Sequence, residues 1–138
     1  MSSGITLFDG ALQLLQSLRG KIKLGLASMN DREVVEHLLK VMSLERFFSV
    51  VVTADDVARS KPDPEIFLKC AGELKSMPER CVVVEDSVFG VEAAKTAKMK
   101  CIAVLTGVHC KEMLEKADAD LIVNSLTEKN EILNFVFG

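Results

Sequence analysis

The sequence predicts an α/β fold, a three-layer Rossmann-like parallel sheet with helices on both faces, and three observations support this. Short apolar runs recur along the chain, segments with helical periodicity lie between them, and the runs are apolar at successive rather than alternate positions. Strands that are apolar on both faces are typical of parallel sheets covered by helices on each side. With 138 residues, 49% of them hydrophobic, the chain can form one domain with its own core, residues 1–138.

Five short apolar runs are the expected strands. They span residues 22–27, 49–52, 81–85, 101–105 and 121–123. Three segments between them are the expected helices, 31–42, 64–74 and 87–98, the last of which is rich in alanine. Ligands of such sheets bind at the carboxyl ends of the strands, so the polar residues that follow each run are the candidate site residues.

Composition and charge argue against two classes of partner. The net charge is −3 and the pI about 5.4, and the 17 Lys and Arg residues are scattered, so no basic field exists to attract nucleic acid. No apolar run approaches the roughly 20 residues of a membrane span, and the first residues, MSSGITLF, lack the features of a secretory signal. We therefore expect a cytoplasmic protein with no nucleic acid or membrane partner. No two of the four cysteines are spaced C-x-x-C, and we expect buried free thiols at Cys70, Cys81, Cys101 and Cys110.

Ser28 ends the first of these runs, just before an expected helix. Its hydroxyl and the free N–H groups of that helix would together hold an anionic oxygen. The alternative is that Ser28 or Asn30 only caps the helix. The residue types alone leave both interpretations open.

Lys61 lies between the second and third runs, in the stretch SKPDPEIF. Pro62 and Pro64 stiffen the backbone around it, and a proline in the first turn favours the start of the following helix. A lysine on a stiff loop can offer its ammonium group to a phosphate or a carboxylate. The alternative is an ordinary solvated lysine.

Glu85 and Asp86 end the run CVVVE side by side. Adjacent carboxylates raise each other's pKa unless a cation or hydrogen-bond donors stabilise their charges. Two oxygen ligands at the end of a parallel strand suit Mg²⁺, which binds one or two carboxylates together with waters and phosphate oxygens. The alternative is that they cap the following helix, although capping needs only one of them.

Together, these residues resemble three motifs of the haloacid dehalogenase-like hydrolases, in order and spacing. The motif stretches are ASMN, SKPDPEIF and VVVEDSVFGVEAAKTA, and the similarity is greatest to the phosphoglycolate phosphatase and β-phosphoglucomutase branch. The resemblance covers about residues 9–125. It implies that Ser28, Asn30 and Lys61 bind the phosphoryl group, Lys61 neutralising it, and that Asp86, supported by Glu85, ligates Mg²⁺. Such phosphoryl transfer relies on positioning and electrostatics.

The family's first motif, a strand ending in Asp-x-Asp whose first aspartate is the nucleophile, has no counterpart in this chain. The nearest stretch, ITLFDGALQLLQSL, allows two interpretations. In the first, residues 8–11 are the segment that re-enters the core after the cap domain, so that the first strand, the nucleophile and the cap are absent. In the second, ITLF is a shortened first strand and Asp9 is a surviving nucleophile, with Ala11 at the acid position and turnover lower by roughly 10² to 10⁴. We favour the first.

In the family, the first strand lies between the strand that carries Ser28 and the strand that carries Glu85. Its loss would be compensated in one of three ways: ITLF inserts, the two strands close up, or a second chain fills the gap in a homo-oligomer. Relatives also have glycine at the position of Lys98, which predicts a positive φ there.

The resemblance implies a Mg²⁺-dependent phosphatase or phosphomutase acting on a small phosphorylated metabolite, truncated or inactive as this chain. The alternative is a non-catalytic relative that serves as a binding or interaction module. A receiver-like signalling domain would require a strand that ends in an isolated aspartate, and none of the expected strands does.

Overall fold

The structure, a computed structural model, describes residues 10–105 and 109–138. Its elements alternate between helix and strand. In chain order they are α1 (Ala11–Leu18), β1 (Gly25–Ala27), α2 (Arg32–Val41), η1 (Glu45–Phe47), β2 (Val50–Val52), η2 (Ala54–Asp56), α3 (Glu65–Leu74), η3 (Pro78–Arg80), β3 (Val82–Glu85), α4 (Val88–Thr96), β4 (Lys100–Val104), α5 (Lys111–Lys116), β5 (Leu121–Val123) and α6 (Lys129–Phe137). All five expected strands and all three expected helices form.

The strands make two parallel sheets rather than one continuous sheet. β1 pairs with β2, and β4 lies between β3 and β5. Within the described residues β1 and β3 do not pair, so the strands that flank the expected gap have not closed up. The α/β fold class is confirmed, with the sheet divided where a strand was expected to be missing.

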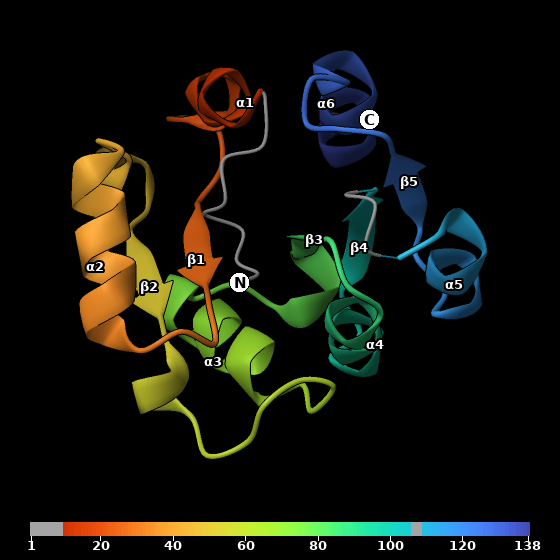
Figure 1. Ribbon diagram of the computed structural model, residues 1–138. Coiled ribbons are helices and arrows are strands. Elements are labelled where there is room, and N and C mark those ends of the chain that lie inside the picture. The colour runs from red at the N-terminus through yellow and green to blue at the C-terminus, as the bar shows by residue number, and fades with distance from the viewer. Residues whose placement is uncertain (1–9, 106–108) are drawn as a thin grey trace.

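Helices cover both faces of the strands, as the sequence predicts. On one face α1, α2 and α6 pack on residues such as Leu26 and Ile102, and on the other α3, α4 and α5 pack on residues such as Val52 and Cys101. Figure 1 shows α1 and α6 on the opposite side of the strands from α3 and α4. Side chains from alternate positions of β4 enter opposite core clusters, as the pleat of a strand requires.

The residues that cap α2 and α4 are not the site residues for which capping was the alternative interpretation. Asp31, not Ser28 or Asn30, caps α2, because its carboxylate accepts a hydrogen bond from the Val34 N–H. Ser87, not Glu85 or Asp86, caps α4 by accepting from the Gly90 N–H. Capping therefore does not explain the candidate residues.

The prediction for the backbone of Lys98 and the prediction for the four cysteines have different outcomes. Lys98 has φ 65°, so the positive φ expected at the end of α4 is confirmed. All four cysteines are free; Cys70 and Cys101 are buried, but Cys81 is half-buried and Cys110 is exposed, so the expectation that all four are buried was wrong for these two. Cys110 immediately precedes α5, where its side chain lies outside the core.

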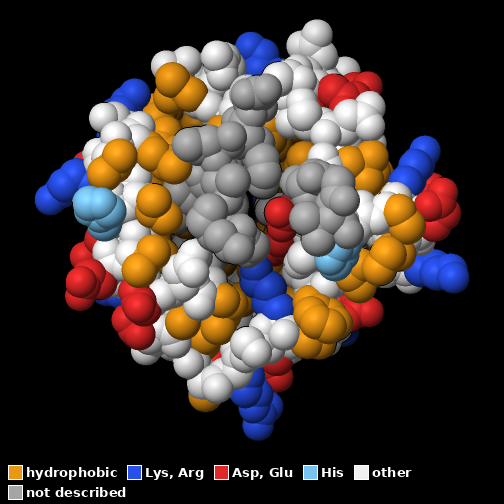
Figure 2. All heavy atoms as spheres, viewed as in Figure 1, with side chains coloured by type: hydrophobic (Ala, Val, Ile, Leu, Met, Phe, Trp, Pro, Cys, Tyr) orange, Lys and Arg blue, Asp and Glu red, His pale blue; other side chains and the backbone are white. Residues whose placement is uncertain are grey.

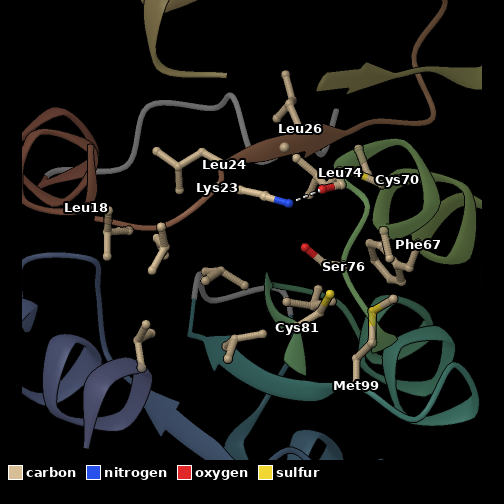
Figure 3. A pocket seen from close by; sticks show the side chains of 18 of the residues that line it. Leu18, Lys23, Leu24, Leu26, Phe67, Cys70, Leu74, Ser76, Cys81 and Met99 are labelled. Atoms are coloured by element: carbon tan, nitrogen blue, oxygen red, sulfur yellow. Dashed lines mark hydrogen bonds between the residues drawn. The ribbon is translucent and has the colours of Figure 1, made fainter. Parts of the chain in front are cut away.

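A cavity of about 760 Å³ separates the two sheets. It is lined by β1 and β3, by α3 on one side and by α1 and α6 on the other. Figure 3 shows Leu24 and Cys81 at opposite sides of this space, with Cys70 and Leu74 of α3 beside it. Val84, expected in a buried strand, is 42% exposed and lines the cavity.

The surface carries mixed charge. On the face shown in Figure 2, most lysine and arginine side chains lie round the margin and one lies near the middle, and they do not gather into one basic patch. Among the described residues, none of the helices combines the length and the apolar character that crossing a bilayer requires.

Candidate active site

Lys61 and Glu85 form an ion pair at the end of β3. The Lys61 Nζ lies 2.8 Å from Glu85 Oε2, and their side chains are only 17% and 10% exposed. The Lys61 ammonium group also lies over the ring of Phe67, with its Nζ 5.3 Å from the ring centroid. The loop before α3 thus positions an ammonium group next to the paired carboxylates.

Glu85 makes further hydrogen bonds on its other oxygen. Its Oε1 accepts from the Asp86 N–H at 3.0 Å and from the Ser87 hydroxyl at 3.5 Å. Its charge is therefore offset by a lysine and two donors within the protein. The resemblance implied that Lys61 neutralises a phosphoryl group and its aspartate partner; in the structure its ammonium group pairs with Glu85.

Asp86 is in a different environment. Burial of its carboxyl, followed by hydrogen bonding to and repulsion from Glu85, raises its pKa to about 6. Lys61 lowers the pKa of Asp86, but by less than these effects raise it. Among the described residues Asp86 has no ion-pair partner, so one carboxyl group without a counter-charge remains at this end of β3.

Ser28 directly follows β1 and is 1% exposed. Its backbone N–H continues the pairing with β2 by donating to the Val52 carbonyl at 3.0 Å. Its hydroxyl accepts from the Asn30 N–H at 3.2 Å. Ser28 and Asn30 thus contact each other, and in the described part of the chain no hydrogen bond or ion pair joins either of them to Lys61, Glu85 or Asp86.

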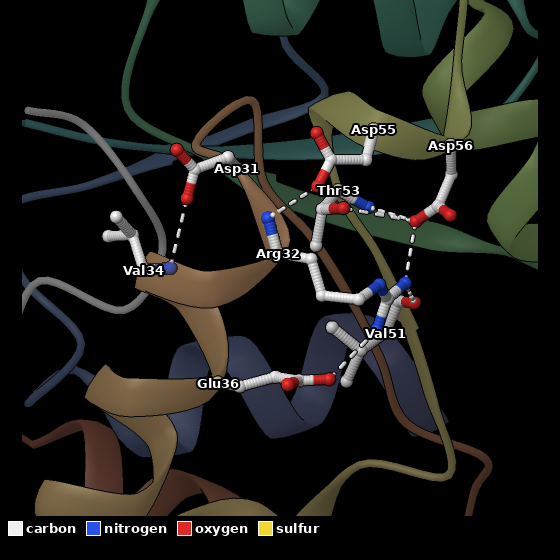
Figure 4. Close-up of polar contacts among 8 residues, drawn as sticks. All are labelled: Asp31, Arg32, Val34, Glu36, Val51, Thr53, Asp55 and Asp56. Atoms are coloured by element: carbon white, nitrogen blue, oxygen red, sulfur yellow. Dashed lines mark hydrogen bonds and ion pairs between the residues drawn. The ribbon is translucent and has the colours of Figure 1, made fainter.

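A polar network that was not predicted from the sequence holds the loop after β1 against the loop after β2. The Arg32 guanidinium donates to Asp56 at 2.6 Å and to the Val51 carbonyl at 3.0 Å, and the Arg32 N–H donates to Asp55 at 3.0 Å (Figure 4). Hydrogen bonds from the Thr53 N–H and from Arg32 lower the pKa of Asp56. These contacts position the segment that carries Ser28.

Two other residues near the paired acids were missed by sequence reasoning. A Cβ placed on Gly90 would lie 2.0 Å from Glu85 Cγ, so the Glu85 side chain occupies the space that the glycine leaves. His109 Nδ1 accepts from the Val88 N–H at 3.1 Å at the start of α4. The motif stretch contained Gly90, but only the fold shows which side chain needs its small size.

The structure therefore brings together Lys61, Glu85 and Asp86. Asp9 lies outside the described residues. Within 10–105 and 109–138, no group of three or more His, Cys, Asp or Glu residues is placed to hold a metal ion. Glu85 and Asp86 are two carboxylates, which matches the small protein ligand set that Mg²⁺ accepts.

Several known proteins are similar to this chain. It is 42% identical over 126 residues to the phosphorylated carbohydrates phosphatase of Thermotoga maritima, covering 90% of this chain and 55% of that protein. It is 36% identical over 129 residues to the validoxylamine A 7'-phosphate phosphatase of Streptomyces hygroscopicus subsp. limoneus, covering 93% and 59%. The crystal structure of a β-phosphoglucomutase candidate from Thermotoga maritima superposes with a TM-score of 0.86 at 35% identity, covering 94% of this chain and 60% of that one.

In each comparison the chain spans little more than half the length of the protein it matches. The family model described as haloacid dehalogenase-like hydrolase matches residues 1–104. This match extends over more than half of the chain and includes Ser28, Lys61, Glu85 and Asp86. The chain belongs to the haloacid dehalogenase-like hydrolase family.

Proposed function

We propose that this chain carries the phosphate-binding and Mg²⁺-binding part of a phosphatase or phosphomutase that acts on a small phosphorylated metabolite. The observation that carries the proposal is the cluster at the end of β3, where one ammonium group meets two carboxylates of which only Glu85 is neutralised. The names of the similar proteins, phosphatases of phosphorylated carbohydrates and of validoxylamine A 7'-phosphate, support the substrate class.

Each candidate residue has a role in this proposal. Asp86 would hold Mg²⁺, with Glu85 beside it, and the bound ion would supply positive charge to phosphoryl oxygens. Lys61 would pair with Glu85 and add a second positive charge at the same place. Ser28 and Asn30, on the loop after β1, would hydrogen-bond the phosphoryl group, and Asp9 is the candidate nucleophile. The whole of residues 1–138 would act as one core domain.

A second candidate function is a binding module without catalysis. Two observations favour it: the Ser28 hydroxyl is buried and already accepts from Asn30, and the Lys61 ammonium group is held by Glu85. In this case the chain would bind Mg²⁺ and phosphate without turning over a phosphate ester.

Calorimetry and a hydrolysis assay on the full chain test the proposal. Mg²⁺ should bind weakly to the wild type and not detectably to Asp86→Ala, and equal affinities would remove the metal role. Hydrolysis of p-nitrophenyl phosphate that is abolished by Asp9→Asn would establish Asp9 as the nucleophile. Hydrolysis that survives Asp9→Asn would exclude it, and Mg²⁺ binding with no hydrolysis by the wild type would favour the binding module.

A further inference from the structure

The loop that carries Lys61 joins η2 to α3 and has no regular secondary structure. η2 ends at Asp56 and α3 begins at Glu65, so the loop spans residues 57–64. Figure 1 shows it leaving the side of β2 and extending toward the start of α4 before it returns to α3. A loop of this kind samples many conformations unless hydrogen bonds close it. The position of Lys61 therefore depends on what fixes the backbone around it.

The Glu65 carboxylate closes this loop by accepting backbone hydrogen bonds from its other end. Its Oε1 accepts from the Ala58 N–H at 3.1 Å and from the Arg59 N–H at 2.9 Å, and its Oε2 accepts from the Ala58 N–H at 3.2 Å. Hydrogen bonds to a carboxylate are roughly twice as strong as those between neutral groups. They join residues that are seven and six positions apart, with Lys61 between them.

Glu65 is itself fixed, because α3 begins at this residue. Ile66 and Phe67, which follow it in the helix, are 0% and 6% exposed and belong to a core cluster. The Glu65 N–H donates to Asp63 Oδ1 at 2.9 Å, and the Asp63 N–H donates to the Ser60 carbonyl at 3.0 Å. The carboxylate that closes the loop thus belongs to a rigid helix end.

Two simpler roles for Glu65 do not account for these contacts. Among the described residues, no cationic side chain forms an ion pair with it. The helix dipole favours a carboxylate in the first turn, but that effect does not require the side chain to bond to residues outside the helix. The ion pair between Arg59 and Asp63 in the same loop spans 3.6 Å, and the Arg59 side chain is 76% exposed, so it contributes little.

We propose that Glu65 is the positioning residue for Lys61. Its carboxylate fixes the loop so that the Lys61 Nζ lies 2.8 Å from Glu85 Oε2 and over the ring of Phe67. In the described structure Glu65 has no hydrogen bond or ion pair with either member of that pair, so it acts through the backbone. The consequence for phosphate binding rests on the proposed function, whereas the placement of Lys61 does not.

Acylation of lysine amines in the full chain tests the inference without a substrate. Lys61 is 17% exposed and paired, so an N-hydroxysuccinimide ester of acetic acid should modify it more slowly than the exposed Lys40. Glu65→Ala should raise the rate at Lys61, relative to that at Lys40, by at least about 3-fold, because the opened loop exposes the amine. Glu73→Ala, which removes the other glutamate of α3, is the matched control and should leave the ratio unchanged. Equal ratios in the two variants would overturn the proposal.

Two conservative variants separate closure of the loop from the helix dipole. Glu65→Gln keeps the length of the side chain and an oxygen that can accept from Ala58 and Arg59, but it removes the charge. Glu65→Asp keeps the charge in the first turn, but its shorter side chain cannot reach both N–H groups. Closure predicts that Lys61 is modified more slowly in Glu65→Gln than in Glu65→Asp, and the dipole alone predicts the reverse order. The reverse order would refute the proposal.

Binding of inorganic phosphate in the presence of Mg²⁺ connects Glu65 with the proposed function. Glu65→Ala should weaken phosphate binding in the wild-type background and have no further effect in a Lys61→Met background. Equal weakening in both backgrounds would show that Glu65 does not act through Lys61 and would overturn the proposal. Absence of phosphate binding by the wild type would refute the proposed function, and the acylation rates would still decide the role of Glu65.

Discussion

The ion pair between Lys61 and Glu85 makes a quantitative prediction about stability. At 2.8 Å and an effective dielectric constant of about 20, the attraction between the two charges is about 6 kcal/mol, before the cost of removing them from water. Replacing Lys61 with Met would leave Glu85, 10% exposed, without a counter-charge. Loss of one partner of a buried pair costs about 3–5 kcal/mol, so we expect Lys61→Met to lower the free energy of unfolding by about 2–4 kcal/mol.

A double-mutant cycle separates the pair from the rest of the side chains. Glu85→Gln alone should cost less, about 1–3 kcal/mol, because the longer Lys61 side chain can reach water. The double variant Lys61→Met/Glu85→Gln leaves neither charge unpaired and should be more stable than the sum of the single variants predicts by about 2 kcal/mol. Urea unfolding at pH 7 measures each free energy.

Lys95 provides a matched control for this cycle. Its Nζ lies 2.7 Å from Asp120 Oδ2, but the two side chains are 26% and 31% exposed. Lys95→Met should therefore cost at most about 1 kcal/mol. Additive effects of Lys61→Met and Glu85→Gln, or an equal cost for Lys95→Met, would refute the argument that burial makes the Lys61 pair important.

Three further predictions concern Gly90, Asp86 and Arg32. Gly90→Ala should cost about 1–3 kcal/mol, because the new methyl group displaces Glu85, whereas Gly72→Ala, with nothing within 4 Å of its Cβ, should be neutral or stabilising in urea unfolding. The folded state binds a proton at Asp86 more tightly than the unfolded state, so the contribution of Asp86 to stability should be full below its ordinary pKa of 3.8 and be lost as the pH rises through about 6. Asp86→Asn should remove this pH-dependent loss of stability. At pH 7 the variant should be more stable by about 1–2 kcal/mol, after allowance for the partial exposure of Asp86. Unfolding free energies measured over a pH series would contradict the prediction if the variant showed the same pH dependence as the wild type. Arg32→Met should cost about 1 kcal/mol and speed hydrogen exchange of the Ala54 amide, which donates to the Asn30 carbonyl, while unchanged exchange would show that Arg32 does not hold the two loops together.

The elements of the fold were predictable from local patterns, because strands that are apolar on both faces and helices with a 3.6-residue period leave clear signals. The short helices α5 and α6 were not predicted, and their amphipathic pattern spans few turns. The division of the sheet was not predicted; the expectation was that ITLF, closure of the two flanking strands or a second chain would compensate for a missing strand. Which edges pair is a tertiary property, since the apolar runs of β1 and β3 do not encode a register with each other.

The contacts between residues of the candidate site were likewise not predictable from the local sequence. The flanking prolines indicated that Lys61 is held in place, and the paired acids indicated a cation, but the pairing of Lys61 with Glu85 joins residues 24 positions apart. The network of Arg32 and Asp56 likewise depends on how two loops meet after separate strands. Neither pairing can be read from the local sequence, because a charged residue that forms such a pair has the same sequence neighbours as one that stays exposed to solvent.

The split sheet also affects how cooperatively the protein unfolds. The core cluster of β1, β2 and α2, built on Leu26, Val35 and Leu39, draws on residues from the first part of the chain. Among the described residues, α3 contacts both sheets, because Ile66 and Phe67 pack in a cluster that includes Val52 of β2 and Cys101 of β4. This helix therefore couples two units that could each lose their structure alone. If that coupling is weakened, the two sheets should melt in separate steps, and a single midpoint would no longer describe the protein.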